Sequence, residues 1–282
     1  MAEITQMTYQ RQDTSRVPVE VISFDQLRAL NHGQTQRTDF TIVAVISGGH
    51  GSVTIDFTDY VLASRCAVWI APGAVHRWAD IAHLTGHLVL FVPTAPVTPA
   101  TRESAATPNA VAVWPVDPEI WNFVCGALSH LQLETSPETT TQQTELPEIL
   151  VSAFIARLKP PHTRAPSGNS AFARFRTNVE VHFRQHHDVS HYARALGYSP
   201  RTLSRAALKE TGRTAKTFIN DRLILEAKRL LAHDRYTSAR CASELGFMDA
   251  SNFSLFFLRA TGQRPGAWQA HATGSRLGGD VR

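Results

Sequence analysis

Two short runs of residues, fifty positions apart, carry side chains that are able to read the edges of DNA bases. In the major groove, Arg pairs with guanine through two hydrogen bonds and Asn does so with adenine, whereas Ser, Thr and Ala meet phosphates or a thymine methyl group. The candidate residues are Arg201, Thr202, Ser204 and Arg205 in the first run and Ala250, Ser251, Asn252 and Ser254 in the second. On one isolated helix such residues are more often a solvated face. The elements that hold them therefore decide the interpretation.

Further basic residues follow both runs, at positions expected near helix ends. These residues are Lys209, Arg213, Lys216, Arg259 and Arg264. Lys and Arg at such places suit contacts with phosphates, which set affinity and salt dependence rather than sequence preference.

The segments that must position both runs are copies of one another. Eight residues have a counterpart fifty positions later, without an insertion, and four of the eight pairs are identical. The first members are Leu203, Ser204, Ala207, Leu208, Thr211, Gly212, Ala215 and Phe218. An apolar helix, a turn that contains Gly and a second helix form a helix-turn-helix, so the sequence predicts two of these units in tandem.

Each predicted second helix must bury one stripe of side chains and expose another. The first starts at Pro200, and Asp249 is expected to cap the start of the second. The predicted buried residues are Leu203, Ala207 and Leu208 in the first copy and Phe253, Phe256 and Phe257 in the second. This assignment leaves the base-reading runs outward, at the N-terminal end of each helix.

Apolar residues at helical spacing predict two further helices around the repeat. Phe172, Phe175, Val179 and Phe183 mark a helix before the first copy. Ile219, Leu223, Ala227, Leu230 and Leu231 mark a helix of about four turns between the copies, with Arg222 and Glu226 among its polar positions. One rigid connecting helix would hold the two reading helices in successive major grooves, about 34 Å apart.

The N-terminal half has a different periodicity. Residues 17 to about 95 alternate apolar and polar in short runs, which predicts antiparallel strands in a small barrel or sandwich. Two helices are expected next, one from Pro118 to about Leu131 and one from about Pro147 to Leu158. The pair is expected either to pack on the barrel or to form a dimer interface.

The sequence thus predicts an α+β protein of two domains. A β-barrel with a helical pair spans 1–158, a linker rich in Pro, Gly and Ser spans 159–170, and an all-α domain with two helix-turn-helix units spans 171–270. Residues 271–282 are expected to form a flexible tail.

Charge divides between the two halves of the 282 residues. Residues 1–170 contain 10 Lys and Arg against 15 Asp and Glu, whereas residues 171–282 contain 18 against 9. A basic helical half joined to an acidic half favours a polyanion as the partner of the C-terminal half alone. An Arg-rich surface that is merely solvated is the alternative.

Composition limits the remaining classes of protein. No apolar run approaches about 18 residues and the N-terminus lacks the apolar centre of a secretory signal, so we expect a cytoplasmic protein without a membrane partner. Cys66, Cys125 and Cys241 are widely separated and are expected to be reduced thiols.

The C-terminal half resembles the two-unit DNA-binding domain of the AraC/XylS transcriptional regulators. The resemblance covers roughly 172–270 and is most specific in the second copy, at Ala242, Gly246, Phe247, Ser251, Phe253, Phe257, Gly262 and Pro265. It implies a regulator, in most cases an activator, that binds half-sites on double-stranded DNA as a homodimer. One departure is Ala207, where the family commonly has Phe.

The N-terminal half resembles, more weakly, the cupin-like barrel that precedes this module in many members of the family. Pro72, Gly73 and His76 form the matching phrase. The chain lacks the HxH pair of metal-binding cupins, so we expect no metal, no cofactor and no catalytic residue. The resemblance instead implies a small-molecule effector in the barrel.

The expected effector-binding residues are Arg37, His76, Trp78 and His32. Arg37 suits a carboxylate and Trp78 suits a ring or a sugar face. Two other functions stay open. One is a metal-dependent cupin-type enzyme fused to a DNA-binding domain, and the other is a DNA-binding regulator that needs no ligand.

Overall fold

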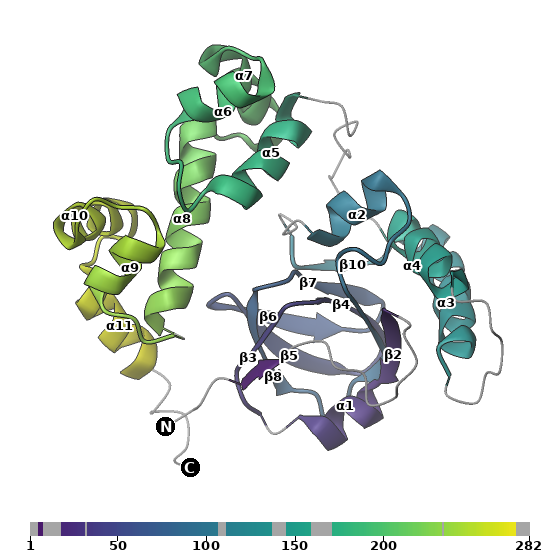
Figure 1. Ribbon diagram of the computed structural model, residues 1–282. Helices are drawn as coiled ribbons and strands as arrows, with labels where there is room; N and C mark the ends of the chain where they lie inside the picture. Colours follow the sequence, from purple (N-terminus) through teal and green to yellow (C-terminus); the bar gives the residue numbers. More distant parts are fainter. Residues whose placement is uncertain are drawn as a thin grey trace. The chain divides into compact units, whose positions relative to one another are not determined.

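The computed structural model shows an α+β protein of two compact units, Met1–Arg164 and Ala165–Arg282 (Figure 1). It describes residues 5–7, 18–31, 33–106, 111–136, 145–158, 171–232 and 234–274. The division between the units falls in the segment 159–170, which lies outside the described residues, as do residues 275–282 of the expected tail.

Two five-stranded sheets form the N-terminal unit. The first has the order β1 (Thr5–Met7), β3 (Gln36–Thr38), β8 (Val75–Asp80), β5 (His50–Ile55), β6 (Thr58–Ala63). The second has the order β10 (Val113–Pro115), β7 (Cys66–Ile70), β4 (Thr41–Gly48), β9 (Thr85–Phe91), β2 (Val19–Ser23). Every described pairing is antiparallel except that of β1 with β3, which is parallel.

Alternate residues of the strands build two separate cores. Ile42, Ala44 and Ile46 of β4 join Val53 and Trp78 of the other sheet in a cluster that lies between the sheets. The intervening residues of β4 face the opposite side of their sheet. Burial on both faces makes β4 and β7 of the second sheet nearly continuous apolar runs, whereas β5 of the first sheet keeps the alternation with a period of two.

Two helices cover that outer face, as one of the two expectations for them required. Val43 and Trp69 of the sheet pack in one cluster with residues of α3 (Pro118–Glu134) and α4 (Leu146–Arg157). The Asp117 side chain accepts a hydrogen bond from the Glu119 backbone N–H at 2.8 Å and so caps α3. Two short helices, α1 (Phe24–Leu30) and α2 (Pro99–Ala106), were not predicted.

The C-terminal unit is entirely helical in its described residues. Its helices are α5 (Ala171–His182), α6 (Val189–Leu196), α7 (Pro200–Thr211), α8 (Ala215–Ala232), α9 (Ser238–Glu244), α10 (Ala250–Thr261) and α11 (Pro265–Gly274). The duplication is structural, because α7 and α10 both have twelve residues and start fifty positions apart. Both end at a glycine in the left-handed region, Gly212 at φ 70° and Gly262 at φ 76°, where a side chain would cause strain.

The predicted core of this unit is confirmed except at Leu208, which is exposed, and at Phe256, which is only partly buried. The predicted apolar residues of α5 and α8 are buried, as are Leu203, Ala207, Phe253 and Phe257. Leu208, however, is 53% exposed. Ala207 follows Leu203 by four residues and shares its face, whereas Leu208 lies about 100° further round the helix. The prediction that Leu208 is a core residue is therefore wrong.

The cluster that contains Ala207 also contains aromatic residues from outside α7. Phe172 and Phe175 of α5 lie against Phe218 of α8, with ring centroids 5.4 and 5.8 Å from it. In the second copy α10 itself contributes aromatic rings, and the centroids of Phe253 and Phe257 are 5.9 Å apart.

A buried carboxylate joins α5 to the connecting helix α8. Glu226 is 1% exposed, and it accepts hydrogen bonds from three guanidinium groups. Its partners are Arg184 at 2.6 Å, Arg222 at 3.1 Å and Arg229 at 3.3 Å. Arg222 also binds Glu180 of α5 at 2.8 Å. A carboxylate at this depth requires such partners, because loss of its water would otherwise cost several kcal/mol.

The loop after α5 also contacts the second helix-turn-helix. Gly246 has a φ of 70°, and a Cβ atom there would lie 2.3 Å from the carbonyl oxygen of Arg184. The rings of His187 and Phe247 are 4.8 Å apart between centroids, and Lys216 donates to the His187 carbonyl at 2.8 Å. The two copies are thus joined by side-chain packing as well as by α8.

Leu203→Ala and Leu208→Ala provide a matched pair that tests the packing of α7. Leu203 is fully buried, so its truncation is expected to reduce the free energy of unfolding by about 2–5 kcal/mol. Truncation of the exposed Leu208 is expected to reduce the free energy of unfolding by less than about 0.5 kcal/mol. Urea unfolding followed by far-ultraviolet circular dichroism measures both. Equal losses for the two variants would contradict the observed orientation of α7.

Candidate nucleic-acid interface

The second helix of the first helix-turn-helix, α7, is its expected recognition helix, and it exposes the predicted base-reading residues. Arg201, Thr202 and Arg205 are exposed and Ser204 is half-buried. Ser199 caps the helix, because its hydroxyl oxygen accepts a hydrogen bond from the Thr202 backbone N–H at 3.1 Å. The hydroxyl oxygens of these two residues are 2.9 Å apart. The cap and Pro200 at the first helical position set the start of α7 and so hold the two arginines on its first turns.

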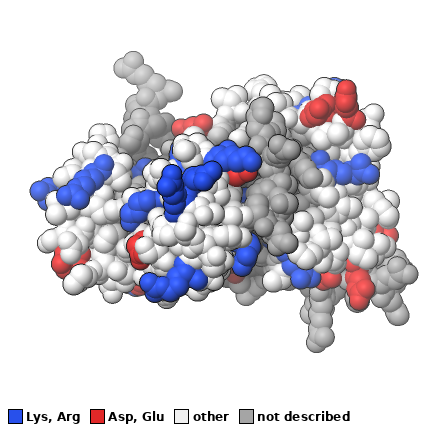
Figure 2. All heavy atoms as spheres, turned by 90° about the horizontal axis from the view of Figure 1, so that it is seen from above, with Lys and Arg blue, Asp and Glu red and all other residues white. Residues whose placement is uncertain are grey.

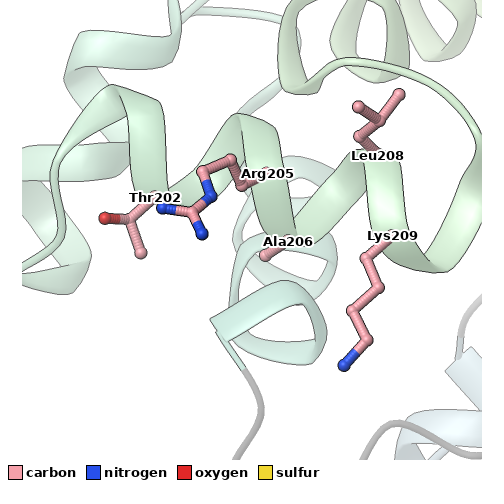
Figure 3. Close-up of a pocket in the computed structure, with 5 residues that line it drawn as sticks. All are labelled: Thr202, Arg205, Ala206, Leu208 and Lys209. Carbon is pink, nitrogen blue, oxygen red and sulfur yellow. The ribbon is translucent and has the colours of Figure 1, made fainter.

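Side chains of α7 border a shallow hollow in its surface. Its lining residues are Thr202, Arg205, Ala206, Leu208 and Lys209 (Figure 3). The charged ends of Arg205 and Lys209 extend from the helix, whereas Leu208 points to a different side of α7 from Lys209. The hollow therefore combines two positive charges with apolar surface.

The second recognition helix, α10, exposes a neutral polar face. Ser251 and Asn252 are exposed, and Ala250 and Ser254 are half-buried. Asp249 caps the helix, as predicted, because its carboxylate accepts from the Asn252 backbone N–H at 2.7 Å. The predicted core residue Phe256 is only partly buried and packs at the edge of the cluster.

The basic residues predicted to contact phosphates divide into two groups. Lys209, Arg259 and Arg264 are exposed, at or just beyond the C-terminal ends of the recognition helices. Arg213 forms an ion pair with Asp221 at 2.7 Å, and Lys216 is bound to the carbonyl of His187. Figure 2 shows Lys and Arg side chains gathered on the part of its face that the C-terminal unit forms.

One contact at this interface was missed by the sequence analysis. The side-chain nitrogen of Asn252 donates to the Asp249 carboxylate at 3.0 Å, so the cap holds a predicted base-reading side chain as well as the backbone. The signal was local, because a capping Asp followed three residues later by Asn allows this bond.

The predicted effector residues are not all brought together. His76 and Trp78 lie on the inner face of β8, with ring centroids 6.3 Å apart. Gln36 is the β3 neighbour of His76, whereas Arg37 is the neighbour of Val75. Because side chains alternate along a strand, Arg37 lies on the opposite face of the sheet from His76. The prediction that Arg37 shares a pocket with the two rings is therefore wrong. His32 lies outside the described residues.

His76 is an isolated polar group between the sheets. It is 1% exposed, and neither ring nitrogen has a hydrogen-bond partner among the described residues. Burial lowers the pKa of His76 to about 4, although the backbone of Ala74 and the carboxylate of Asp56 act in the opposite direction. The imidazole is therefore neutral near pH 7, and it offers one donor and one acceptor.

Within the part of the chain that the structure describes, no group of three or more His, Cys, Asp or Glu side chains is placed to hold a metal ion. His50 and His83 are stacked 5.2 Å apart between ring centroids. Among the described helices, none is both long and apolar enough to cross a membrane.

Sequence comparison places the helical unit among known domains. A family model described as a helix-turn-helix domain matches residues 192–271, which run from α6 into α11. The transcriptional activator RhaR of Cronobacter sakazakii is 32% identical over 92 residues, which are 33% of this chain and 31% of that protein. RhaR of Escherichia coli K12 is 32% identical over 71 residues, which are 25% of each chain. The chain thus spans less than a third of these curated relatives.

One solved structure is similar to part of the chain, and another is similar to most of it. The DNA-binding domain of AdpA, in complex with a target DNA, is 26% identical and covers 38% of this chain and 97% of its own, with a TM-score of 0.35. ToxT from Vibrio cholerae, bound to an unsaturated fatty acid, is 13% identical and covers 94% of this chain and 99% of its own, with a TM-score of 0.41.

The buried His76 makes the N-terminal unit sensitive to acid. Its pKa is about 4 in the folded unit and 6.5 in the unfolded chain, so between these values the unfolded state binds more protons. Stability is therefore expected to fall as the pH decreases from 6.5 towards 4, by roughly 3 kcal/mol in all. The His76→Gln variant should not show this decrease of stability with falling pH. The His83→Gln variant, changed at an exposed site, should show it as the wild type does.

Tryptophan fluorescence during urea unfolding measures this slope, because four of the five tryptophans, at positions 69, 78, 114 and 121, belong to the N-terminal unit. A slope that is the same in wild type and His76→Gln would show that His76 does not stay neutral in the folded protein.

Proposed function

We propose that this chain, which belongs to the AraC/XylS family of regulators through its C-terminal helix-turn-helix unit, binds specific sites on double-stranded DNA and activates transcription there. The observation that carries the proposal is the repeated geometry of α7 and α10. Both are twelve-residue helices, both are capped by a side chain at the same relative position, and both expose polar residues on their first turns.

The two helices suit complementary parts of this task. Arg201 and Arg205 are exposed donors that fit guanine, and Lys209, Arg259 and Arg264 fit phosphates on either side. Because α8 and the packing of His187 on Phe247 connect the copies, we propose that they read two successive segments of the major groove as one body.

The N-terminal unit is proposed to hold a small-molecule effector between its sheets. The unpaired, neutral imidazole of His76 supports this assignment, since a buried polar group without a partner is destabilising unless a ligand satisfies it. With Trp78 beside it and Arg37 on the other face of the sheet, the site favours a largely apolar, uncharged ligand with one hydrogen-bonding group. Binding would shift the balance between two arrangements of the protein.

We also propose a homodimer through α3 and α4. Phe123, Leu133 and Ile149 on these helices are exposed, and a second copy would cover them. The protein is proposed to act in the cytoplasm and to lack enzymatic activity. Stoichiometric iron, manganese or zinc in the purified protein would instead favour the cupin-type enzyme.

Selection from a pool of random DNA duplexes tests the proposed function. The full chain is expected to enrich one sequence, and Arg201→Ala or Arg205→Ala should then weaken binding to it by about 1–3 kcal/mol and relax preference at one base pair. Arg77→Ala removes one exposed positive charge from the N-terminal unit and should bind as the wild type does.

Two outcomes would count against these assignments. Failure of the wild type to enrich any sequence would exclude sequence-specific binding. A uniform loss across all sequences in the Arg201→Ala or Arg205→Ala variant would reassign that arginine to a phosphate.

A further inference from the structure

The caps of the two recognition helices differ in their hydrogen-bond chemistry. In the first copy Ser199 and Thr202 are paired hydroxyls, 2.9 Å apart, and either oxygen can be the donor. In the second copy Asp249 and Asn252 occupy the equivalent positions, fifty residues later. A carboxylate can only accept hydrogen bonds, so it imposes a direction that the Ser–Thr pair lacks.

This direction fixes the amide of Asn252. Its backbone N–H and its side-chain nitrogen both donate to Asp249, at 2.7 and 3.0 Å. Reversal of the amide would set its oxygen against a carboxylate oxygen. The Asn252 side chain is exposed, and its oxygen, with two unused lone pairs, therefore faces away from the cap.

A second side chain of α10 is polarised in the same way. The hydroxyl of Ser254 donates to the carbonyl of Ala250 at 2.7 Å, which leaves its oxygen as an acceptor. From Asp249 to Leu258 the sequence contains no Lys or Arg. The start of α10 thus presents the amide oxygen of Asn252 as an oriented acceptor and has no positive charge, in contrast to the guanidinium donors of α7.

We propose that Asn252 makes α10 a reader of exocyclic amino groups, namely N6 of adenine or N4 of cytosine, in the major groove. These are the donors that this groove presents, whereas guanine and thymine present the acceptors O6, N7 and O4. Asp249 is the positioning residue, because it acts only through the amide that it orients. The inference rests on the proposed DNA binding and deepens it.

Duplex selection with three proteins tests the assignment. The wild type is expected to enrich adenine or cytosine at a position that loses its preference in Asn252→Ala. Asp249→Ser keeps a capping side chain and gives the second copy the hydroxyl of the first, so the amide is free to reverse. That variant is expected to accept guanine or thymine at the same position.

Removal of the amino group itself provides the chemical control. In the selected duplex, purine replaces adenine, or 2-pyrimidinone replaces cytosine, at that position. The wild type is expected to bind the modified duplex roughly 5- to 150-fold more weakly than the unmodified one. The Arg205→Ala variant, which binds both duplexes more weakly, is expected to show the same ratio between them. The Asn252→Ala variant is expected to bind the two duplexes equally well.

Each alternative result has a separate meaning. An unchanged preference in Asn252→Ala, or a wild-type preference for guanine or thymine at the Asn252-dependent position, overturns this inference and leaves the proposed function intact. Failure of the wild type to enrich any sequence overturns both. Circular dichroism of Asp249→Ser and Asn252→Ala checks that α10 remains folded.

Discussion

The C-terminal unit depends on the neutralisation of one buried carboxylate. Glu226 lies in the middle of α8, away from water, and its three arginine partners come from α8 itself and from the segment that follows α5. Removal of one partner of a buried ion pair is costly, because the charge that remains is neither solvated nor paired. The same segment provides the backbone against which Gly246 packs. The segment after α5 thus pairs with the charge of Glu226 and packs against Gly246, and these two contacts fix the positions of the two helix-turn-helix units relative to one another.

The two copies keep one backbone geometry and differ in charge and in hydrogen-bond direction. Helix length, cap position and the left-handed glycine are the same in α7 and α10. The first copy gains its aromatic packing from neighbouring helices and exposes arginines, whereas the second has aromatic residues in α10 itself and exposes neutral polar side chains. The two copies thus share their backbone geometry and differ in core packing and in the chemistry of their exposed positions.

Local patterns predicted most of the helical unit, and long-range partners account for what they missed. The buried faces of α5 and α8 follow from helical spacing alone. Leu208 was misplaced because it lies about 100° round α7 from Ala207, outside the arc of the helix that faces the core. The buried state of Glu226 depends on Arg184, which is 42 residues away in the sequence. In the N-terminal unit, alternation predicted the strands, but the side of the sheet on which Arg37 lies depends on the register of β3 with β8. The short helices α1 and α2 have too few residues for a periodic signal.

The connecting helix also restricts how this protein can diverge. Because α8 is one continuous helix of 18 residues, insertion of a single residue within it would turn the second copy by about 100° about the helix axis and move it by about 1.5 Å. Contacts on both sides of the insertion would then be lost together. Changes of length are therefore expected in loops elsewhere, whereas the helical unit should evolve by substitution at its surface, with the spacing between its two copies conserved.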